Sequence, residues 1–271
     1  MFDSASRSEG PSGPMTDLPR IVRVDARLHL AVDFHNGADR ITERREEGAF
    51  RFRFPRAHGR APEAILVNVA GGLAGGDRVT TGITIGDKAT LAVSSAAAER
   101  IYRSAGTATE LSTRLAIESG GSGIWLPQET ILHDGARLQR QFEIDLAGDS
   151  ALVFGELLYF GRRASGEGFG RGALCESWRV RRGGRLIFAD GTRLSGDFAN
   201  DILHPTALGG HVALATLLFA APDGGDHIDA IRETLREDLR QAGIAYEFMG
   251  EALGGRPADP ALYDAGQQRP N

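Results

Sequence analysis

Apolar and polar residues alternate along most of the chain between Arg20 and about Asp201. Leu28, Leu30 and Val32 alternate with more polar neighbours, and Phe50 and Phe52 flank Arg51 in the same way. This period of two is typical of strands with one buried face. Glycine-rich turns interrupt the runs roughly every 8 to 12 residues, which is the spacing of all-β architectures. The pattern predicts an all-β domain.

The turn at Gly86 separates two such runs, 78–85 and 89–95. If the runs form a hairpin, a two-residue loop would send Ile83 and Leu91 to opposite faces, whereas a three-residue loop pairs Ile85 with Ala89 and keeps one face apolar. We therefore expect the longer loop, unless both faces are buried in a layered or coiled stack of sheets.

The character of the sequence changes after Asp201. The stretch 204–225 is compatible with one more strand pair or with a short helix. Residues 226–242 are clearer, because apolar residues recur at helical spacing at Ile228, Ile231, Leu235 and Leu239. Asp226 and Gly243 stand at the expected N-cap and C-cap. The apolar stripe of this helix is expected to pack on its own domain, with docking on a partner as the minority interpretation.

Length and composition favour one domain, 20–250, between a polar, disordered leader, 1–19, and a loose tail, 251–271. No sequence repeat is evident. The N-terminus lacks the apolar core of a secretory signal, and the longest apolar stretch, from Val212, is about half of the ~20 residues that a membrane span needs. We expect a cytoplasmic protein. The net charge of −5 leaves no basic excess for nucleic acid or an anionic membrane.

Candidate chemistry is sparse. The glycine-rich AGGLAGGDR, 70–78, lacks the lysine and following helix of a phosphate loop. None of the 7 histidines has the spacing of a metal motif, although His35 and His133 each have an acid within two positions. The single cysteine, Cys175, is expected to be a small buried side chain. Carboxylates are plentiful, and a glycosidase-like pair stays open; the candidates are Glu129, Asp134, Glu156, Glu167, Asp190 and Asp197.

Five segments in order give a more specific indication: AGGLAGGD (70–77), AERIYRS (98–104), WLPQETILHDGA (125–136), FGRRASGE (160–167) and WRVRRGGRLIFADG (178–191). In sequence and spacing they resemble the urease accessory protein family UreD, also called UreH. The resemblance implies a β-helix-like stack of sheets with one or two C-terminal helices. It also implies a non-enzymatic chaperone that binds apo-urease subunits with UreF and the GTPase UreG and supports nickel loading through an internal passage.

The resemblance extends to individual positions, and the three acids among them, Asp77, Glu129 and Glu167, are candidates to hold Ni²⁺ weakly in transit. Hard oxygen ligands suit such a role because they release the ion, so we expect no tightly bound metal. The resemblance to a non-enzymatic family also implies that the chain has no catalytic residue and no tightly bound cofactor. Each acid has an alternative structural interpretation, as a turn cap or as a partner of Arg103 or Arg162. The other matching positions are Gly71, Gly72, Gly75, Gly76, Tyr102, Arg103, Ser104, Trp125, Leu126, Pro127, Gln128, Gly161, Arg162 and Gly166.

Two rival functions stay open at this point. One is a carbohydrate-active hydrolase with paired carboxylates, and the other is a β-rich binding module such as a lectin. The isolated protein is also expected to be poorly soluble, because surface reserved for partners is usually apolar.

Overall fold

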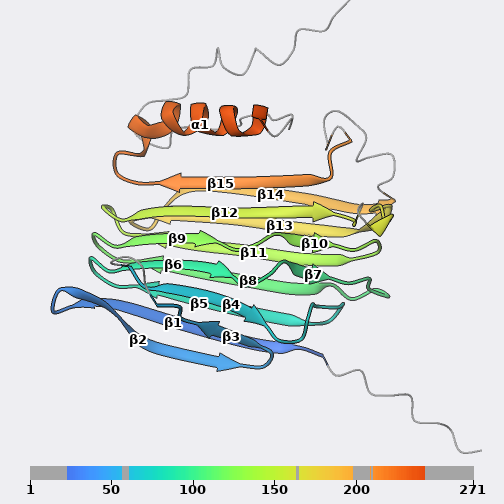
Figure 1. Cartoon of the computed structure of the whole chain (residues 1–271), viewed down its shortest axis with the longest axis horizontal. Coiled ribbons are helices and arrows are strands. Elements are labelled where there is room, and N and C mark those ends of the chain that lie inside the picture. The colour runs from blue at the N-terminus through green and yellow to red at the C-terminus, as the bar shows by residue number, and fades with distance from the viewer. Residues whose placement is uncertain (1–22, 57–60, 163–164, 198–207, 209, 242–271) are drawn as a thin grey trace, which may run out of the picture.

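The computed structural model describes residues 23–56, 61–162, 165–197, 208 and 210–241. Their strands form two stacked sheets (Figure 1). The first sheet contains β1 (Asp25–His35), β2 (Ala38–Glu47), β5 (Arg78–Ile85), β8 (Thr109–Ile117), β11 (Arg137–Leu146), β13 (Arg171–Arg182) and β14 (Arg185–Asp197). The second contains β3 (Phe50–Arg53), β4 (Glu63–Asn68), β6 (Thr90–Ser95), β7 (Glu99–Ile101), β9 (Ser122–Leu126), β10 (Thr130–Leu132), β12 (Ala151–Phe160) and β15 (Ala213–Ala220).

The chain winds as a coil from one sheet to the other, and each turn of the coil pairs in parallel with the turn before it. In the first sheet β5, β8, β11 and β13 pair in this way, and in the second sheet β4, β6, β9 and β12 do. One side-chain contact between neighbouring turns joins Asn68 to Glu99, which lie 31 residues apart in the sequence. The expected all-β, β-helix-like stack is confirmed.

The hairpin expected at Gly86 is wrong. β5 lies in the first sheet and β6 in the second, so the turn between them is a corner of the coil. Its backbone is tied to the previous turn, because the Gly86 N–H donates to the Val32 carbonyl at 2.8 Å. Ile83 and Leu91 are both buried between the sheets. Both runs therefore have a buried inner face without pairing with each other, as in the coiled alternative.

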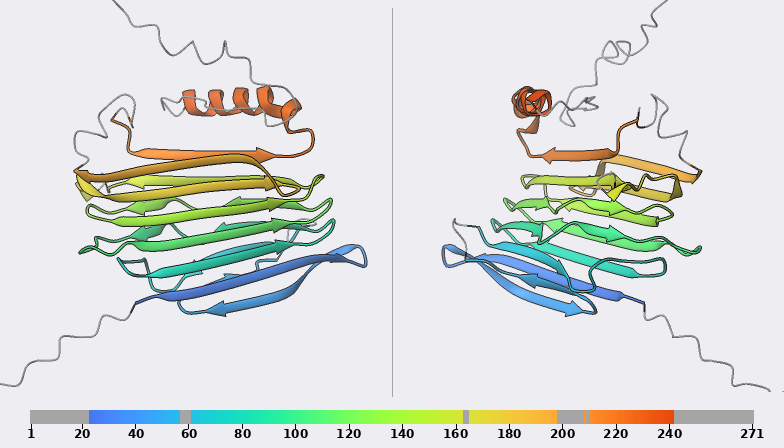
Figure 2. Two further views of the ribbon diagram at one scale, coloured as in Figure 1. Left: turned by 180° about the vertical axis from the view of Figure 1, so that it is seen from behind. Right: turned by 45° about the vertical axis from the view of Figure 1, so that its right-hand side comes forward.

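The two ends of the stack are closed by different elements (Figures 1 and 2). At the N-terminal end β1 forms an antiparallel hairpin with the highly charged β2. At the other end β15 pairs antiparallel with β12, so the stretch that was compatible with a strand pair or a helix supplies one described strand. The 3₁₀ turn η3 (Gly224–His227) and helix α1 (Ile228–Gln241) follow, and α1 runs alongside β15.

The predicted C-terminal helix is confirmed, with a start two residues later than expected. Asp226 lies within the 3₁₀ turn, whose own N-cap is Asp223 without a side-chain capping bond, so the N-cap assignment is wrong. Ile228, Ile231 and Leu235 are half-buried. The expected cap Gly243, the leader and the tail lie outside the described residues.

The core fills the space between the sheets. Inward side chains of both sheets meet in a group of aromatic rings in which Trp178 lies 4.4 Å from Phe142 and 5.1 Å from Phe154, measured between ring centroids. Trp125 stacks on Phe154 with the ring centroids 5.5 Å apart. Aromatic pairs at these distances add attraction beyond the burial of their surface, so this group fixes one sheet on the other. Cys175 is half-buried, not fully buried as expected.

Candidate functional site

The glycine-rich motifs gather at one corner of the coil, where the turns of successive layers stack. Leu73 pairs with Ile101 in a parallel bridge, and the Tyr102 N–H donates to the Leu73 carbonyl at 2.7 Å. One layer further, the His133 N–H donates to the Ile101 carbonyl at 3.0 Å. The segments 70–77, 98–104 and 125–136 are therefore neighbours in space at this corner.

Two glycines of the first turn make room for the YRS segment of the next. A β-carbon on Gly72 would lie 2.4 Å from the Tyr102 ring, and one on Gly75 would lie 2.0 Å from the Ser104 hydroxyl. The Tyr102 hydroxyl donates to the Gly71 carbonyl at 2.9 Å. Glycine is required at these two positions because a neighbouring layer occupies the space of a side chain.

Asp77 anchors the residue that precedes β1 to the glycine-rich turn before β5. Its carboxylate is buried and accepts hydrogen bonds from the backbone N–H of Val24 at 2.8 Å and of Ala74 at 2.7 Å. Such bonds satisfy donors that would otherwise be buried without partners. The geometry matches the turn-capping interpretation, and its predicted role in nickel transit stays a prediction.

Glu167 forms a second anchored carboxylate in the fourth stacked turn. It accepts from the Asp134 N–H at 2.9 Å and from Arg162 Nε at 2.6 Å, and also forms an ion pair with that arginine. The backbone bond from Asp134, followed by the bonds and charge of Arg162, lowers the pKa of Glu167. Glu129 is half-buried between β9 and β10, and its backbone carbonyl accepts from the Glu99 N–H at 2.9 Å.

His133 lies beside this corner without a hydrogen bond to its Nε2 atom among the described residues. Its ring packs edge-on against Tyr102 with the centroids 4.8 Å apart. Burial first, and then the charge of Arg162, lowers the pKa of His133, so it is neutral near pH 7. In the described part of the chain no three His, Cys, Asp or Glu side chains are grouped as metal ligands.

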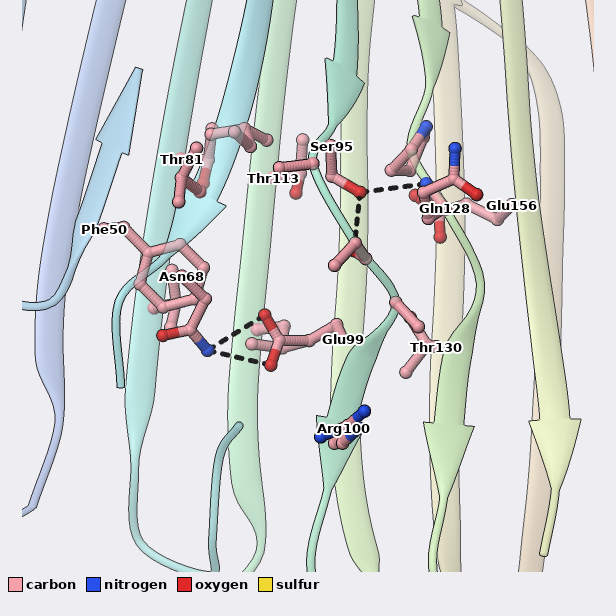
Figure 3. A pocket seen from close by; sticks show the side chains of 18 of the residues that line it. Phe50, Asn68, Thr81, Ser95, Glu99, Arg100, Thr113, Gln128, Thr130 and Glu156 are labelled. Carbon is pink, nitrogen blue, oxygen red and sulfur yellow. Dashed lines mark hydrogen bonds between the residues drawn. The ribbon is translucent and has the colours of Figure 1, made fainter. Parts of the chain in front are cut away.

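A pocket of about 260 Å³ opens next to the motif corner, between the two sheets (Figure 3). It lies where the second sheet is interrupted, since β6 and β9 each break off before the chain continues as β7 and β10. In one break Ser95 Oγ accepts from the Gln128 N–H at 2.9 Å. Motif positions in the pocket wall are Gly71, Gly72, Trp125, Pro127 and Gln128.

Two carboxylates that face this pocket were not selected as site residues from the motifs. Glu99 is half-buried, and both its oxygens accept from Asn68 Nδ2, at 2.9 and 3.1 Å. No cationic side chain forms an ion pair with it within the part of the chain that is described. Loss of water around Glu99 raises its pKa to about 7, although the bond from Asn68 opposes that shift. Glu99 is thus able to exchange a proton near neutral pH.

Glu156 belongs to a buried charged triad at the inner wall of the pocket. Arg140 Nη1 donates to Glu156 Oε2 at 2.8 Å, and Arg140 Nε donates to Glu176 Oε2 at 2.5 Å. The second oxygen of each glutamate accepts from a tryptophan indole, Trp125 for Glu156 and Trp178 for Glu176. Burial raises the pKa of Glu156, against the opposing charge of Arg140. The triad joins strands of both sheets.

The triad was missed as a unit, although its sequence signal is visible. Arg140, Glu156 and Glu176 each occupy an inward position of their strand, between apolar inward neighbours two residues away. A charge at such a position needs a partner. Which charges meet depends on the coil register, which the alternation does not specify.

No helix in the described parts of the chain has the length and apolarity that crossing a membrane requires.

The chain matches known proteins over most of its length. The family model described as "UreD urease accessory protein" matches residues 24–255. The urease accessory protein UreD of Methylobacterium sp. strain 4-46 is 43% identical over 222 residues, which cover 82% of this chain and 79% of the relative. The protein of the same name from Azorhizobium caulinodans is 40% identical over 231 residues, 85% of either chain.

Proposed function

The chain belongs to the UreD family of urease accessory proteins, and on this premise we propose that it is a urease maturation chaperone. In this role it binds apo-urease together with UreF and the GTPase UreG, in the cytoplasm, and supports delivery of nickel into the urease active site. It carries out no catalysis of its own. Nickel is its cargo and not a resident cofactor.

The observation that carries the nickel part of the proposal is the pocket between the sheets. Its wall combines family-motif residues with the carboxylates Glu99 and Glu156. Carboxylate oxygens hold Ni²⁺ less tightly than a His or Cys cage would, which favours release. We propose that the pocket is one section of the passage, and that Asp77, Glu129 and Glu167 act at other points along it.

The rival hydrolase function has less support. A glycosidase needs two carboxyl groups that face a substrate in an open cleft. Glu156 and Glu176 are both buried and share Arg140, and each of them also accepts from an indole. Both carboxylate oxygens of each residue therefore already accept hydrogen bonds within the fold, and none is left to act on a substrate.

The test is urease activity in a urease-expressing host whose own ureD gene is deleted. We expect the wild-type chain to restore activity, and Glu99→Gln and an Asp77→Ala/Glu129→Ala/Glu167→Ala variant to restore less. The abundance of each variant and its capture of UreF are measured in the same cells, because Asp77 and Glu167 also hold the fold.

A matched control removes three acids from the outer face of the first sheet, as Glu110→Ala/Glu143→Ala/Asp145→Ala. We expect this control to activate urease like the wild type. Equal activity of the control and the motif variant, at equal abundance, would contradict a role of the three motif acids in nickel transit. Inactivity of the wild type with compatible partners would contradict the proposed function itself.

A further inference from the structure

In the described part of the chain, no helix covers the N-terminal end of the stack (Figures 1 and 2). Its last strands are β2 in the first sheet and β3 in the second, and each pairs with a single neighbour, β1 and β4. The last strand of a sheet presents unpaired backbone groups to which another strand can add. An open end of a coiled stack therefore needs a cap that stops it from continuing into another molecule.

The free edge of β3 follows from the way this strand pairs with β4. The Ala49 carbonyl accepts from the Val69 N–H at 2.9 Å, and in the same register Arg51 lies opposite Val67. Hydrogen-bonded pairs alternate with non-hydrogen-bonded pairs along an antiparallel ladder. The backbone N–H and C=O of Phe52 therefore point away from β4, towards the free edge.

Two side chains of β2 bind these backbone groups. Arg44 and Glu46 lie opposite buried leucines of β1, so they are on the inner face of the first sheet, where the alternation favours apolar residues. Glu46 Oε1 accepts from the Phe52 N–H at 2.5 Å, and Arg44 Nη2 donates to the Phe52 carbonyl at 3.4 Å. Arg44 also donates to Glu46 Oε2 at 2.8 Å. This ion pair, which we call the Arg44–Glu46 clasp, satisfies both free backbone groups of Phe52.

The surroundings hold the clasp in place. The Glu46 side chain is 13% exposed. Burial acts against it, yet the bonds from Arg44 and from the Phe52 N–H lower the pKa of Glu46, so the carboxylate is charged near pH 7. The Arg44 guanidinium lies 5.3 Å from the centre of the Phe54 ring, within the range of a cation–π contact. A strand that added to this edge would have to displace these contacts.

The outer face of β3 adds a second barrier. Arg51 and Arg53 point outward, while Phe50 and Phe52 are buried between the sheets. If β3 paired antiparallel with the same strand of a second copy, opposite residues would share a face, and arginines would meet arginines. Like charges directly opposite each other are destabilising. The two arginines also donate to carbonyls of the free edge, Arg51 to Phe50 at 2.6 Å and Arg53 to Phe52 at 2.9 Å.

We infer that β2 and β3 form a stop at the open end of the coil, which keeps the sheets from continuing into a second copy of the chain. The Arg44–Glu46 clasp blocks the backbone groups that a new strand would need, and the outward arginines of β3 repel the identical strand. Inward-pointing charges and charged edge residues are general means of protecting a sheet edge. The inference does not depend on the proposed function.

The test is sedimentation velocity of the full chain over a range of concentrations. Arg44→Ala/Glu46→Ala removes the clasp, and Arg51→Thr/Arg53→Thr removes the repelling arginines. We expect the wild type and the threonine pair to sediment alike, because the clasp still blocks the edge. All four changes together should strengthen self-association at least tenfold, and the alanine pair alone should give a smaller increase.

Hydrogen exchange of the Phe52 amide tests the clasp in the monomer, where association plays no part. We expect exchange at least tenfold faster in Arg44→Ala/Glu46→Ala. Exchange should be as fast in Arg44→Glu/Glu46→Arg, which keeps the net charge and the two residue types but places a cation where the amide needs an acceptor. The matched control is Arg45→Ala/Glu47→Ala, which removes two exposed charges from the outer face of β2, and it should match the wild type in both assays.

Native tryptophan fluorescence identifies the variants that are folded. The inference is overturned if the folded four-residue variant sediments like the wild type, or if the control associates as strongly as that variant. Unchanged exchange of the Phe52 amide in both clasp variants would overturn it as well. Urease activation is not a readout of either assay, so failure of the stop and failure of the proposed function are observed separately.

Discussion

Replacement of Arg140 by methionine should strongly destabilise the protein. The side chains of Arg140, Glu156 and Glu176 are 4%, 6% and 3% exposed. Without the guanidinium, each glutamate keeps an indole donor and loses its cationic partner. Removing one member of a buried ion pair typically costs about 3–5 kcal/mol, since the remaining charge is left in a medium that solvates it poorly.

The cost of protonating a buried glutamate gives a second estimate of this loss of stability. In the variant, Glu156 can avoid a buried charge by binding a proton, and burial already raises its pKa with Arg140 in place. Protonating a glutamate about 3 pH units above its ordinary pKa, near pH 7.3, costs about 3 × 1.36, or roughly 4 kcal/mol. Near pH 5.3 the same proton costs roughly 1.4 kcal/mol.

The sign of the pH dependence follows from proton binding. A glutamate whose pKa is raised in the folded protein binds more protons than in the unfolded chain, so stability is lost as the pH rises towards the folded pKa. Arg140→Met should therefore lose about 3–5 kcal/mol near pH 7.3 and clearly less near pH 5.3. Adding Glu156→Gln and Glu176→Gln should recover much of the loss, because no buried charge remains.

The assay is urea unfolding of the full chain followed by tryptophan fluorescence. The chain has 2 tryptophans, and both Trp125 and Trp178 donate to the triad. Arg114→Met is the control, because its ion pair with Glu143 is exposed and worth less than about 1 kcal/mol. A loss for Arg140→Met under about 1 kcal/mol, or an equal loss at both pH values, would refute this reasoning.

Three further variants test other parts of the structure by the same unfolding assay. The pKa of Glu99 is raised to about 7, so the free energy of unfolding of the wild type should fall between about pH 4.5 and 7. Glu99→Gln should remove up to roughly 3 kcal/mol of that fall. Parallel pH profiles of unfolding free energy for the wild type and the variant would contradict this. Gly75→Ala should lower the free energy of unfolding by about 1–3 kcal/mol, because its β-carbon would lie 2.3 Å from the Thr107 carbonyl oxygen. The control Gly148→Ala has open space around the added β-carbon, so its unfolding free energy should stay within about 0.5 kcal/mol of the wild type. Asp77→Ala should cost about 1–3 kcal/mol by leaving two backbone donors without their acceptor; unchanged stability with reduced urease activation would instead assign Asp77 to nickel transit.

Local patterns predicted much of the fold. Alternation identified the strands that contain Leu28, Leu30 and Phe52, all of which are buried, and helical spacing identified α1. The corner at Gly86 was not predictable from these patterns, because an inward-facing strand alternates in the same way whether its neighbour in sequence joins its own sheet or the opposite one. The coil repeats its strands and corners without a repeat in the sequence.

The candidate site was predictable only in part. The motifs led to the stacked corner and to part of the pocket wall, including Trp125 and Gln128. Glu99 and the Arg140 triad depend on which layers lie next to each other, and that register comes from contacts between residues about one coil turn apart. The sequence marks such residues as inward charges and leaves their partners open.

The most direct test of the proposed function is the nickel content of urease purified from a ureD-deleted host that expresses this chain. We predict that the wild-type chain restores nickel to the urease active sites, that the host without it yields largely nickel-free urease, and that Glu99→Gln gives an intermediate content at equal protein abundance. Nickel-free urease in the presence of abundant wild-type chain, with compatible UreF and UreG, would contradict the account.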